Sequence, residues 1–297
     1  MDSFEDYFRA GKIASIVRDH AKTMDHTGKT LEQICDLLES EIISQGGKPA
    51  FPVNVSLNEI AAHYTAEPND STIVSNSDIL KIDIGVHING FIADTAVTVS
   101  HDPKNELIIS TAEFALQEAI RMAKVNAKTS DIGRVIENTI NRYGFKPIQN
   151  LSGHSLDQFT IHAGKSIPNI WTTGSFNLSP NQTYAIEPFV TTIDGQGVVY
   201  EGKTRNIFAI VSRKPTKDKN SNEFLQTLWN RFKTLPFAMR WILDEHNESE
   251  ARKLLKILLD RKNVYSYPIL VEGMGKMVTQ AEHTIIPNEG NTIIITK

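Results

Sequence analysis

Cysteine is almost absent from this sequence of 297 residues, because Cys35 is the only one and no disulfide can form within the chain. Cys35 lies in the helical apolar pattern Leu31-x-x-Ile34-Cys35-x-x-Leu38, which indicates a core thiol rather than a nucleophile. No run approaches the roughly 18 apolar residues of a membrane span. The acidic N-terminus contains no apolar signal segment. These absences predict a cytoplasmic protein with no membrane partner.

A strong charge of one sign is also missing. The chain carries 31 Lys and Arg against 35 Asp and Glu, a net charge of −4, and 40% of its residues are hydrophobic. This ordinary globular composition excludes a disordered or collagen-like chain, and the slightly acidic balance argues against a specific nucleic-acid partner. There is no His-Glu-x-x-His of zinc peptidases and no Gly-x-Ser-x-Gly of serine hydrolases.

Apolar periodicity divides the chain into helical and extended segments. Helical patterns cover the first 45 residues, 104–125, 129–143 and 223–262, and strand patterns cover 51–57, 79–99, 183–190, 198–211 and three segments after 268. Ser130 is the expected N-cap of the fourth helix, which should end near Gly144. We expect an α+β core over 1–212 and 271–297, interrupted by a helical insert at 213–270.

The insert differs from the core in charge. Residues 213–271 hold 12 Lys and Arg against 7 Asp and Glu, a net charge of +5. A solvated helix face explains this charge. Contact with a polyanion such as a ribosome surface is the alternative.

The most informative segment is an extended hairpin. Asn89-Gly90 joins two β-rich runs, and this dipeptide favours a two-residue type I′ turn. Residue numbers that face each other then sum to 179, so Asp83 and Asp94 are diagonal neighbours on one face, roughly 7–8 Å apart at the backbone. Two metal ions about 3.5–4 Å apart would fit between these carboxylates and offset their repulsion. The hairpin alone leaves open two solvated aspartates on an exposed face.

Three further residues complete a candidate metal site. His154 follows Gly153 in a loop-like segment, Glu187 ends an apolar strand, and Glu282 lies inside a strand pattern. Taken singly, a surface or core histidine and two edge-strand glutamates are the alternatives. Four carboxylates, one imidazole and no thiolate suit divalent Mn, Fe, Co or Zn without selecting one of them.

This ligand series resembles that of the pita-bread metallopeptidases, and the sequence motifs around the ligands make the resemblance more specific. Asn58-Glu-Ile-Ala-Ala-His63-Tyr-Thr, Asp83-Ile-Gly-Val, Ala93-Asp94-Thr-Ala, Ser152-Gly-His154, Ile161-His162-Ala-Gly-Lys, Ala185-Ile-Glu187-Pro and Glu282-His-Thr resemble methionine aminopeptidases. The helical insert is similar to that of the type 2 subfamily, in its archaeal form. One departure is Ala66, where the family usually has proline.

The resemblance implies a pita-bread fold and removal of the initiator methionine from the N-termini of nascent polypeptides, with a preference for a small second residue. It also implies two divalent metal ions (Co, Mn, Fe or Zn). Asp83 would bind one ion, His154 and Glu187 the other, and Asp94 and Glu282 both. A hydroxide that bridges the ions would be the nucleophile, with Glu187 as the catalytic proton shuttle.

The resemblance extends to the substrate. His63 and His162 resemble the two histidines that contact the scissile amide, and we expect Phe51 and Ile161 to line the pocket of the methionine side chain. A surface position for His63 and plain core positions for Phe51 and Ile161 are the alternatives. We expect a monomer.

Two other functions share this fold. A proline-specific Xaa-Pro peptidase uses the same ligands, but such relatives usually carry a substantial extra N-terminal domain, and only about 50 residues precede the core here. A non-catalytic pita-bread binding protein typically loses ligands, whereas all five are present in this sequence. The sequence therefore favours a methionyl aminopeptidase.

Overall fold

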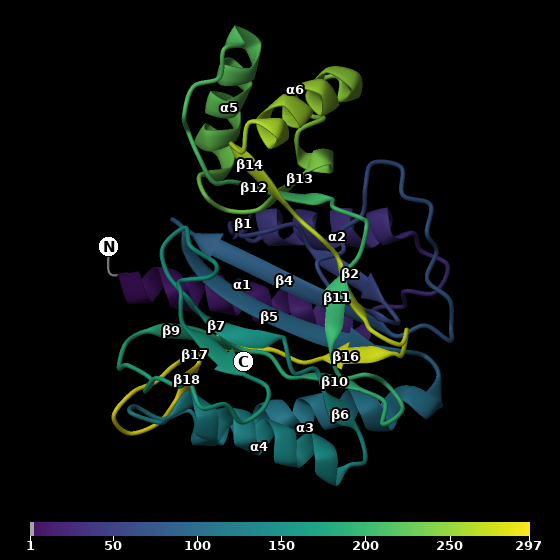
Figure 1. Cartoon of the computed structure of the whole chain (residues 1–297), viewed down its shortest axis with the longest axis vertical. Helices are drawn as coiled ribbons and strands as arrows, with labels where there is room; N and C mark the ends of the chain where they lie inside the picture. The colour runs from purple at the N-terminus through teal and green to yellow at the C-terminus, as the bar shows by residue number, and fades with distance from the viewer. Residues whose placement is uncertain (1–2) are drawn as a thin grey trace.

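This computed structural model describes residues 3–297, whose helices and short strands confirm the α+β class expected from the sequence. α5 (Lys219–Phe232) and α6 (Glu248–Asp260) stand at one end of the molecule, and α3 (Glu106–Met122) and α4 (Thr129–Arg142) lie at the opposite end (Figure 1). Most strands lie between these two helix pairs. None of the helices in the described range is both long and apolar enough to cross a bilayer.

The N-terminal half packs two helices on one sheet. α1 (Ser3–Thr23) covers the long hairpin of β4 (Leu80–Ile88) and β5 (Phe91–Val99), and α2 (Leu31–Ser44) packs beside α1 on the neighbouring strands of the same sheet. The other edge of β4 pairs with two short strands, β1 (Lys48–Pro49) and β2 (Asn54–Leu57). α2 ends before Gly46, which adopts a φ of 84° and confirms the predicted helix stop.

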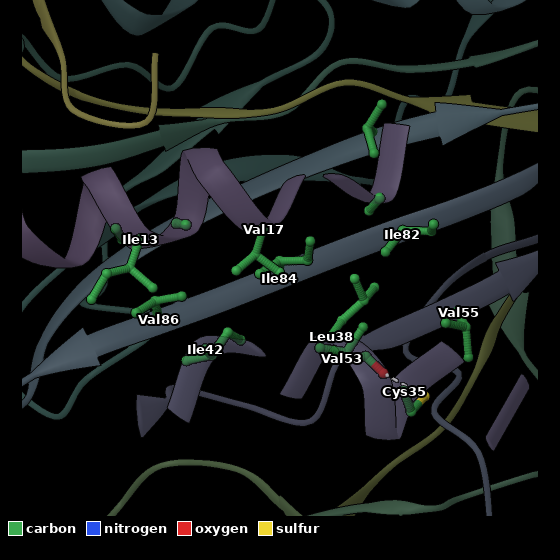
Figure 2. Close-up of a cluster of buried hydrophobic side chains, with 14 of the residues drawn as sticks. Ile13, Val17, Cys35, Leu38, Ile42, Val53, Val55, Ile82, Ile84 and Val86 are labelled. Carbon is green, nitrogen blue, oxygen red and sulfur yellow. Dashed lines mark hydrogen bonds between the residues drawn. The ribbon is translucent and has the colours of Figure 1, made fainter. Parts of the chain in front are cut away.

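A continuous apolar core joins these elements (Figure 2). Val17 of α1, Leu38 of α2 and Ile84 of β4 are fully buried in it. Cys35 is also fully buried, its Sγ donates to the Val53 carbonyl over 3.3 Å, and burial raises its pKa to about 12. The prediction of an unreactive core thiol is confirmed.

The hairpin has the predicted register. Asn89 and Gly90 form the turn with φ angles of 51° and 89°, the left-handed values that a type I′ turn requires. Asp83 faces Ala96, so Asp83 and Asp94 share one face of the ribbon. A purely local signal therefore gave the geometry of the first two carboxylates.

The C-terminal half of the core packs α3 and α4 on two further sheets. A five-stranded sheet has the order β18 (Ile293–Ile294), β17 (His283–Ile286), β9 (Thr183–Ile186), β7 (Ser152–Leu156) and β8 (Ser166–Pro168). A three-stranded sheet has the order β16 (Val278–Gln280), β10 (Phe189–Thr191) and β6 (Lys146–Pro147). Ile136 and Ile140 of α4 and Ile186 and Val190 from the sheets are fully buried in the shared core.

The predicted cap of α4 is wrong by two residues. The helix begins at Thr129, Ser130 lies inside it, and Lys128 is the residue at the N-cap position. Lys128 is extended because it forms an isolated bridge with Asn177, and this contact fixes where the helix starts. Gly144 follows the helix end with a φ of 81°, as expected.

The segment between Ile207 and Tyr267 has a sheet and a core of its own. β12 (Ile207–Ile210) pairs with β13 (Phe237–Ala238) and β14 (Val264–Tyr267), and α5 and α6 pack on this sheet. A sheet of β11 (Val199–Glu201), β15 (Leu270–Glu272) and β3 (Ile60–Ala62) connects both ends of the segment to the core. The boundary at 213–270 stays a prediction.

One helical run over 223–262 was wrong, because β13 and a 3-10 turn (Met239–Trp241) separate α5 from α6. Lys233 turns the chain with a φ of 55°, and Pro236 cannot donate a helical hydrogen bond. Strand β14 was also missed, since its partner β12 is more than 50 residues away.

Candidate metal centre and its pocket

The five predicted ligands line one pocket of about 370 Å³. Asp83 lies on β4, Asp94 on β5 and His154 on β7, whereas Glu187 follows β9 and Glu282 precedes β17. The backbone nitrogen of Glu282 donates to the carbonyl of Ala96 over 3.1 Å, which joins the C-terminal segment to the hairpin. Residues nearly 200 positions apart thus converge.

The side chains of the cluster lie close together and are buried. His154 Nε2 lies 3.5 Å from Glu187 Oε1 and 3.8 Å from Asp94 Oδ2. Asp94, His154 and Glu282 each offer a ligand atom within 4.8 Å of the others. Asp94 is 3% exposed and Glu282 is 1% exposed, so a solvated hairpin face does not describe this site.

Several buried polar atoms of this cluster have no hydrogen-bond partner among residues 3–297. They are Asp83 Oδ1, Asp94 Oδ1, His154 Nδ1 and Glu282 Oε2. Unpartnered buried carboxylate oxygens cost free energy, and a divalent cation coordinated by them would remove that cost. The donor set therefore fits divalent metal ions.

The electrostatics lead to the same conclusion. Burial raises the pKa of Asp83 to about 7. Burial first, and then the neighbouring carboxylates, raises the pKa values of Asp94 and Glu282 well above the usual range. Burial lowers the pKa of His154 to about 3, which keeps its imidazole in the neutral form that binds metal. Without a cation the carboxyl groups retain protons, so metal binding would release them.

Hydrogen bonds from neighbouring side chains orient the ligands. Gln280 Nε2 donates to Glu187 Oε2 over 3.2 Å, and Asn169 Nδ2 donates to the Glu187 carbonyl over 3.2 Å. The Thr284 hydroxyl accepts from the Asp94 backbone nitrogen over 2.7 Å and donates to its carbonyl over 2.6 Å. Such outer contacts fix ligand geometry.

Two glycines allow the close packing around the ligands. A Cβ on Gly153 would lie 2.3 Å from the carbonyl oxygen of Ala185, so β7 can approach β9 only with glycine beside His154. A Cβ on Gly85 would lie 2.2 Å from the ring of Phe51, which occupies that space in the pocket wall. The expected close backbone approach at Gly153 is confirmed.

The two predicted substrate histidines line the same pocket. His63 has a left-handed backbone with a φ of 66°, and its Nδ1 donates to the Pro268 carbonyl over 3.3 Å. Burial lowers its pKa to about 4, so Nε2 remains a free acceptor on a neutral ring. The ring of His162 meets that of His154 edge-on, with centroids 4.5 Å apart, and burial lowers its pKa as well.

The apolar part of the pocket includes both predicted residues. Phe51 and Ile161 line it and belong to one cluster with Leu156 and Leu235. The structure thus brings all nine predicted site residues to one cavity, although their roles stay predictions. Sequence reasoning missed several lining residues, among them Asn54 and Phe189 of the core and four from the insert or its flanks: Ile207, Pro236, Tyr267 and Leu270.

Gln280 was also missed, although the sequence held a signal for it. It lies two residues before Glu282, as a polar side chain in an apolar strand pattern. The residues from the insert had no comparable signal, because only the long-range fold brings them to the cavity.

Comparisons with known proteins agree with this geometry. The model of metallopeptidase family M24 matches residues 5–204. A methionine aminopeptidase of Pyrococcus horikoshii is 42% identical over 97% of both chains. One from Methanothermobacter thermautotrophicus is 38% identical over 99% of this chain and 98% of the relative.

Solved structures show the same fold at low sequence identity. A thermophilic Arx1 superimposes with a TM-score of 0.86 at 15% identity, covering 99% of this chain and 90% of that one. The methionine aminopeptidase of Thermotoga maritima gives 0.71 at 21% identity, covering 99% and 96%. The Pyrococcus furiosus prolidase gives 0.63 at 16% identity and is covered over only 64% of its length. The expected pita-bread fold is confirmed.

Proposed function

Because this chain belongs to metallopeptidase family M24, we propose that its buried carboxylate and imidazole cluster holds two divalent metal ions for peptide hydrolysis. The enzyme is an aminopeptidase that removes the initiator methionine of polypeptides. In the proposal, these ions would be held by Asp83, Asp94, His154, Glu187 and Glu282, with the roles that the resemblance implies. The type 2 subfamily is part of the proposal, supported by the insert that carries α5 and α6.

One observation carries this proposal. Carboxylate oxygens of Asp83, Asp94 and Glu282 that have no hydrogen-bond partner in the described range 3–297 are buried in a cavity that has an apolar wall. Oxygens of this kind need a cation, and the apolar wall provides space for one aliphatic side chain. Because the carboxylate oxygens lie next to this apolar wall, the pocket supports cleavage after a single apolar N-terminal residue.

Each remaining group has a proposed task. Bound divalent ions would polarise the scissile carbonyl and lower the pKa of water in the site. Glu187, whose carboxylate is held by Gln280, would take a proton from that water and pass it to the leaving amine. His63 would accept the scissile N–H at Nε2, because its Nδ1 is committed to the Pro268 carbonyl. His162 would contact the amide at the pocket wall.

The first-residue pocket supports the choice of methionine. Phe51 and Ile161 present apolar surface beside the ligands, and thioethers pack well against aromatic rings. The crowding of five candidate ligands in one pocket supports a small second residue.

The test is peptide cleavage after chelation, followed by add-back of Co, Mn, Fe or Zn singly. We expect chelated enzyme to be inactive and metal to restore cleavage of Met-Ala-Ser, with little action on Ala-Pro peptides. Preference for Ala-Pro would favour the Xaa-Pro peptidase instead. Equal cleavage of Met-Gly and Met-Lys peptides would contradict the second-residue preference.

The proposed partners are nascent chains in the cytoplasm, met by a monomeric enzyme at the ribosome. The net charge of +5 over residues 213–271 supports contact with a polyanion. Co-sedimentation with ribosomes at rising salt tests this contact, and we expect binding that weakens steeply with salt.

A further inference from the structure

The loop that carries His63 is held partly by residues outside the catalytic core. His63 adopts a φ of 66°, which is unfavourable for a residue with a side chain and persists only where surroundings enforce it. The loop after it, Thr65 and Ala66, is buried. The contacts that enforce this conformation therefore decide where the imidazole lies.

The core supplies two of those contacts, because Val55 N donates to the Tyr64 carbonyl over 2.7 Å and Thr65 Oγ1 donates to the Val53 carbonyl over 2.8 Å. The others come from the insert and its flanking segments. Arg240 Nε donates to the Ala66 carbonyl over 2.9 Å, and another guanidinium nitrogen donates to Thr65 Oγ1 over 3.2 Å. Asn206 Nδ2 donates to the Thr65 carbonyl. The carbonyl of Pro268 accepts from His63 itself, as described above.

Arg240 is the best fixed of these groups. Its two terminal nitrogens bind the two carboxylate oxygens of Glu39 on α2, each over 2.9 Å, and one of them also binds Asp36 over 2.8 Å. The indole nitrogen of Trp241 donates to Glu39 over 2.7 Å. The side chains of Arg240 and Glu39 are each 6% exposed. Only a planar guanidinium can bind Glu39 through two atoms and the loop through others.

A second arginine of the insert provides a natural contrast. Arg252 on α6 binds Glu67, the residue next to Ala66, over 3.0 Å. Its side chain is 46% exposed. Within residues 3–297, it donates no hydrogen bond to Thr65 or Ala66. Exposed pairs of this kind contribute little to structure. Arg252 therefore serves as a matched control.

We propose that Arg240 is a positioning residue for catalysis, through which the insert holds the imidazole of His63 in the substrate pocket. The proposal rests on the proposed role of His63 as a substrate contact. Without Arg240, the Ala66 carbonyl and the Thr65 hydroxyl each lose a donor, and His63 can relax from its left-handed conformation. A misplacement of about 1 Å at a reacting amide can cost on the order of 100-fold in rate.

The experiment is a double-mutant cycle on Met-Ala-Ser cleavage by the metal-loaded enzyme. We expect Arg240→Met to lower kcat/KM by about 10- to 100-fold and Arg252→Met to leave it within about twofold. In the His63→Ala background, Arg240→Met should cause no further loss, because Arg240 acts through His63. Metal affinity, measured by calorimetric titration, should be unchanged, since Arg240 contacts none of the five proposed ligands.

A spectroscopic signal reports the position of His63 directly. In ¹⁵N-histidine-labelled enzyme, the signal assigned by its loss in His63→Ala should shift in Arg240→Met and stay in place in Arg252→Met. Arg240→Lys keeps the charge without the planar geometry. If Arg240→Met fails to fold, the same cycle is run with Arg240→Lys, for which we expect the same shift and a loss in kcat/KM.

The outcomes distinguish the positioning role of Arg240 from the proposed substrate contact of His63. Equal losses from the Arg240 variant with and without His63 would mean a merely structural role and would overturn the inference. An unshifted His63 signal, with activity that still depends on His63, would overturn the inference alone. Full activity of His63→Ala would instead overturn the proposed role of His63, and the inference with it.

Discussion

At the scale of single residues, the site depends on buried oxygens that lack a donor. Asp94 Oδ1 and Glu282 Oε2 have no partner within residues 3–297, whereas one oxygen of Glu187 accepts from Gln280. The unpartnered oxygens are available for metal, and the partnered one is held in place. Removing the charge of a ligand such as Asp94 should therefore affect metal binding more than removing the hydrogen bond that orients Glu187.

Asp94→Asn keeps the shape of the side chain and removes its charge. We expect metal affinity and peptidase activity each to fall at least about 100-fold, because a proposed bridging ligand is harder to replace than an outer contact, whose loss typically costs 10- to 100-fold. Metal content by atomic absorption and Met-Ala-Ser cleavage measure this. Unaltered activity would point to a metal-independent binding protein.

Gln280→Met keeps the size of the side chain and removes the donor to Glu187. We expect metal affinity to fall about 10- to 100-fold while the fold is retained. Calorimetric titration checks this, with Gln196→Met as the control, because the exposed side chain of Gln196 donates to Tyr200 rather than to a proposed ligand. Equal affinities of the two variants would show that Gln280 does not orient Glu187.

At the scale of elements, the sequence predicted what local chemistry decides. The register of β4 and β5 followed from Asn89-Gly90, because a two-residue turn leaves only one pairing. The bridge between Ala96 and Glu282 could not be predicted in this way, since no local signal records a contact across 186 residues. The strand pattern made Glu282 a candidate, and only the resemblance joined it to the hairpin carboxylates.

The same limit explains the residues that were missed or misplaced. The start of α4 depends on a bridge from Lys128 to Asn177, and the lining residue Pro236 reaches the pocket only because the insert folds back on the core. Ser130 satisfied a local rule that a tertiary contact overrode.

The approach of β7 to β9 gives a prediction at this scale. Gly153→Ala would place a Cβ 2.3 Å from the Ala185 carbonyl, so the strands must separate and carry His154 with them. We expect a loss of about 1–3 kcal/mol in the free energy of unfolding, measured in urea, and weaker metal binding. Gly174→Ala is the control, because a Cβ there meets no atom within 4 Å. Equal stability of both variants would contradict the packing argument.

At the scale of the whole molecule, the candidate metal centre brings carboxylates from distant segments close enough to repel one another. Hairpin carboxylates meet Glu187 and Glu282 from the other half of the chain, and each raises the proton affinity of its neighbours. Without metal, this repulsion opposes folding. Metal should thus contribute to stability as well as to chemistry.

Metal-free enzyme should become less stable as the pH rises through the range set by Asp83. The pKa of this carboxyl rises from 3.8 to about 7 on folding, so the folded state binds the extra proton between these values. Stability from this group is therefore present at low pH and lost toward pH 7, with each tenfold change in proton affinity worth about 1.4 kcal/mol. Thermal unfolding after chelation measures the trend.

Asp83→Asn provides the control for this prediction. It should make the pH dependence of the chelated enzyme less steep, with the remaining dependence coming from Asp94 and Glu282. Added metal should raise the melting temperature of the wild type more at pH 7 than at pH 5. A wild-type curve parallel to that of Asp83→Asn over this range would refute the assignment.

The convergence of Asp83 and Glu282 also determines when a newly made copy can begin work. During synthesis the hairpin that carries Asp83 and Asp94 is made early. The candidate metal centre lacks one proposed ligand until Glu282 has been translated and has left the ribosome tunnel. Up to that moment we expect the growing chain to be inactive toward other N-termini, because Glu282 is a proposed metal ligand. A truncated product that ends before Glu282 would therefore lack peptidase activity, however well its first half folds.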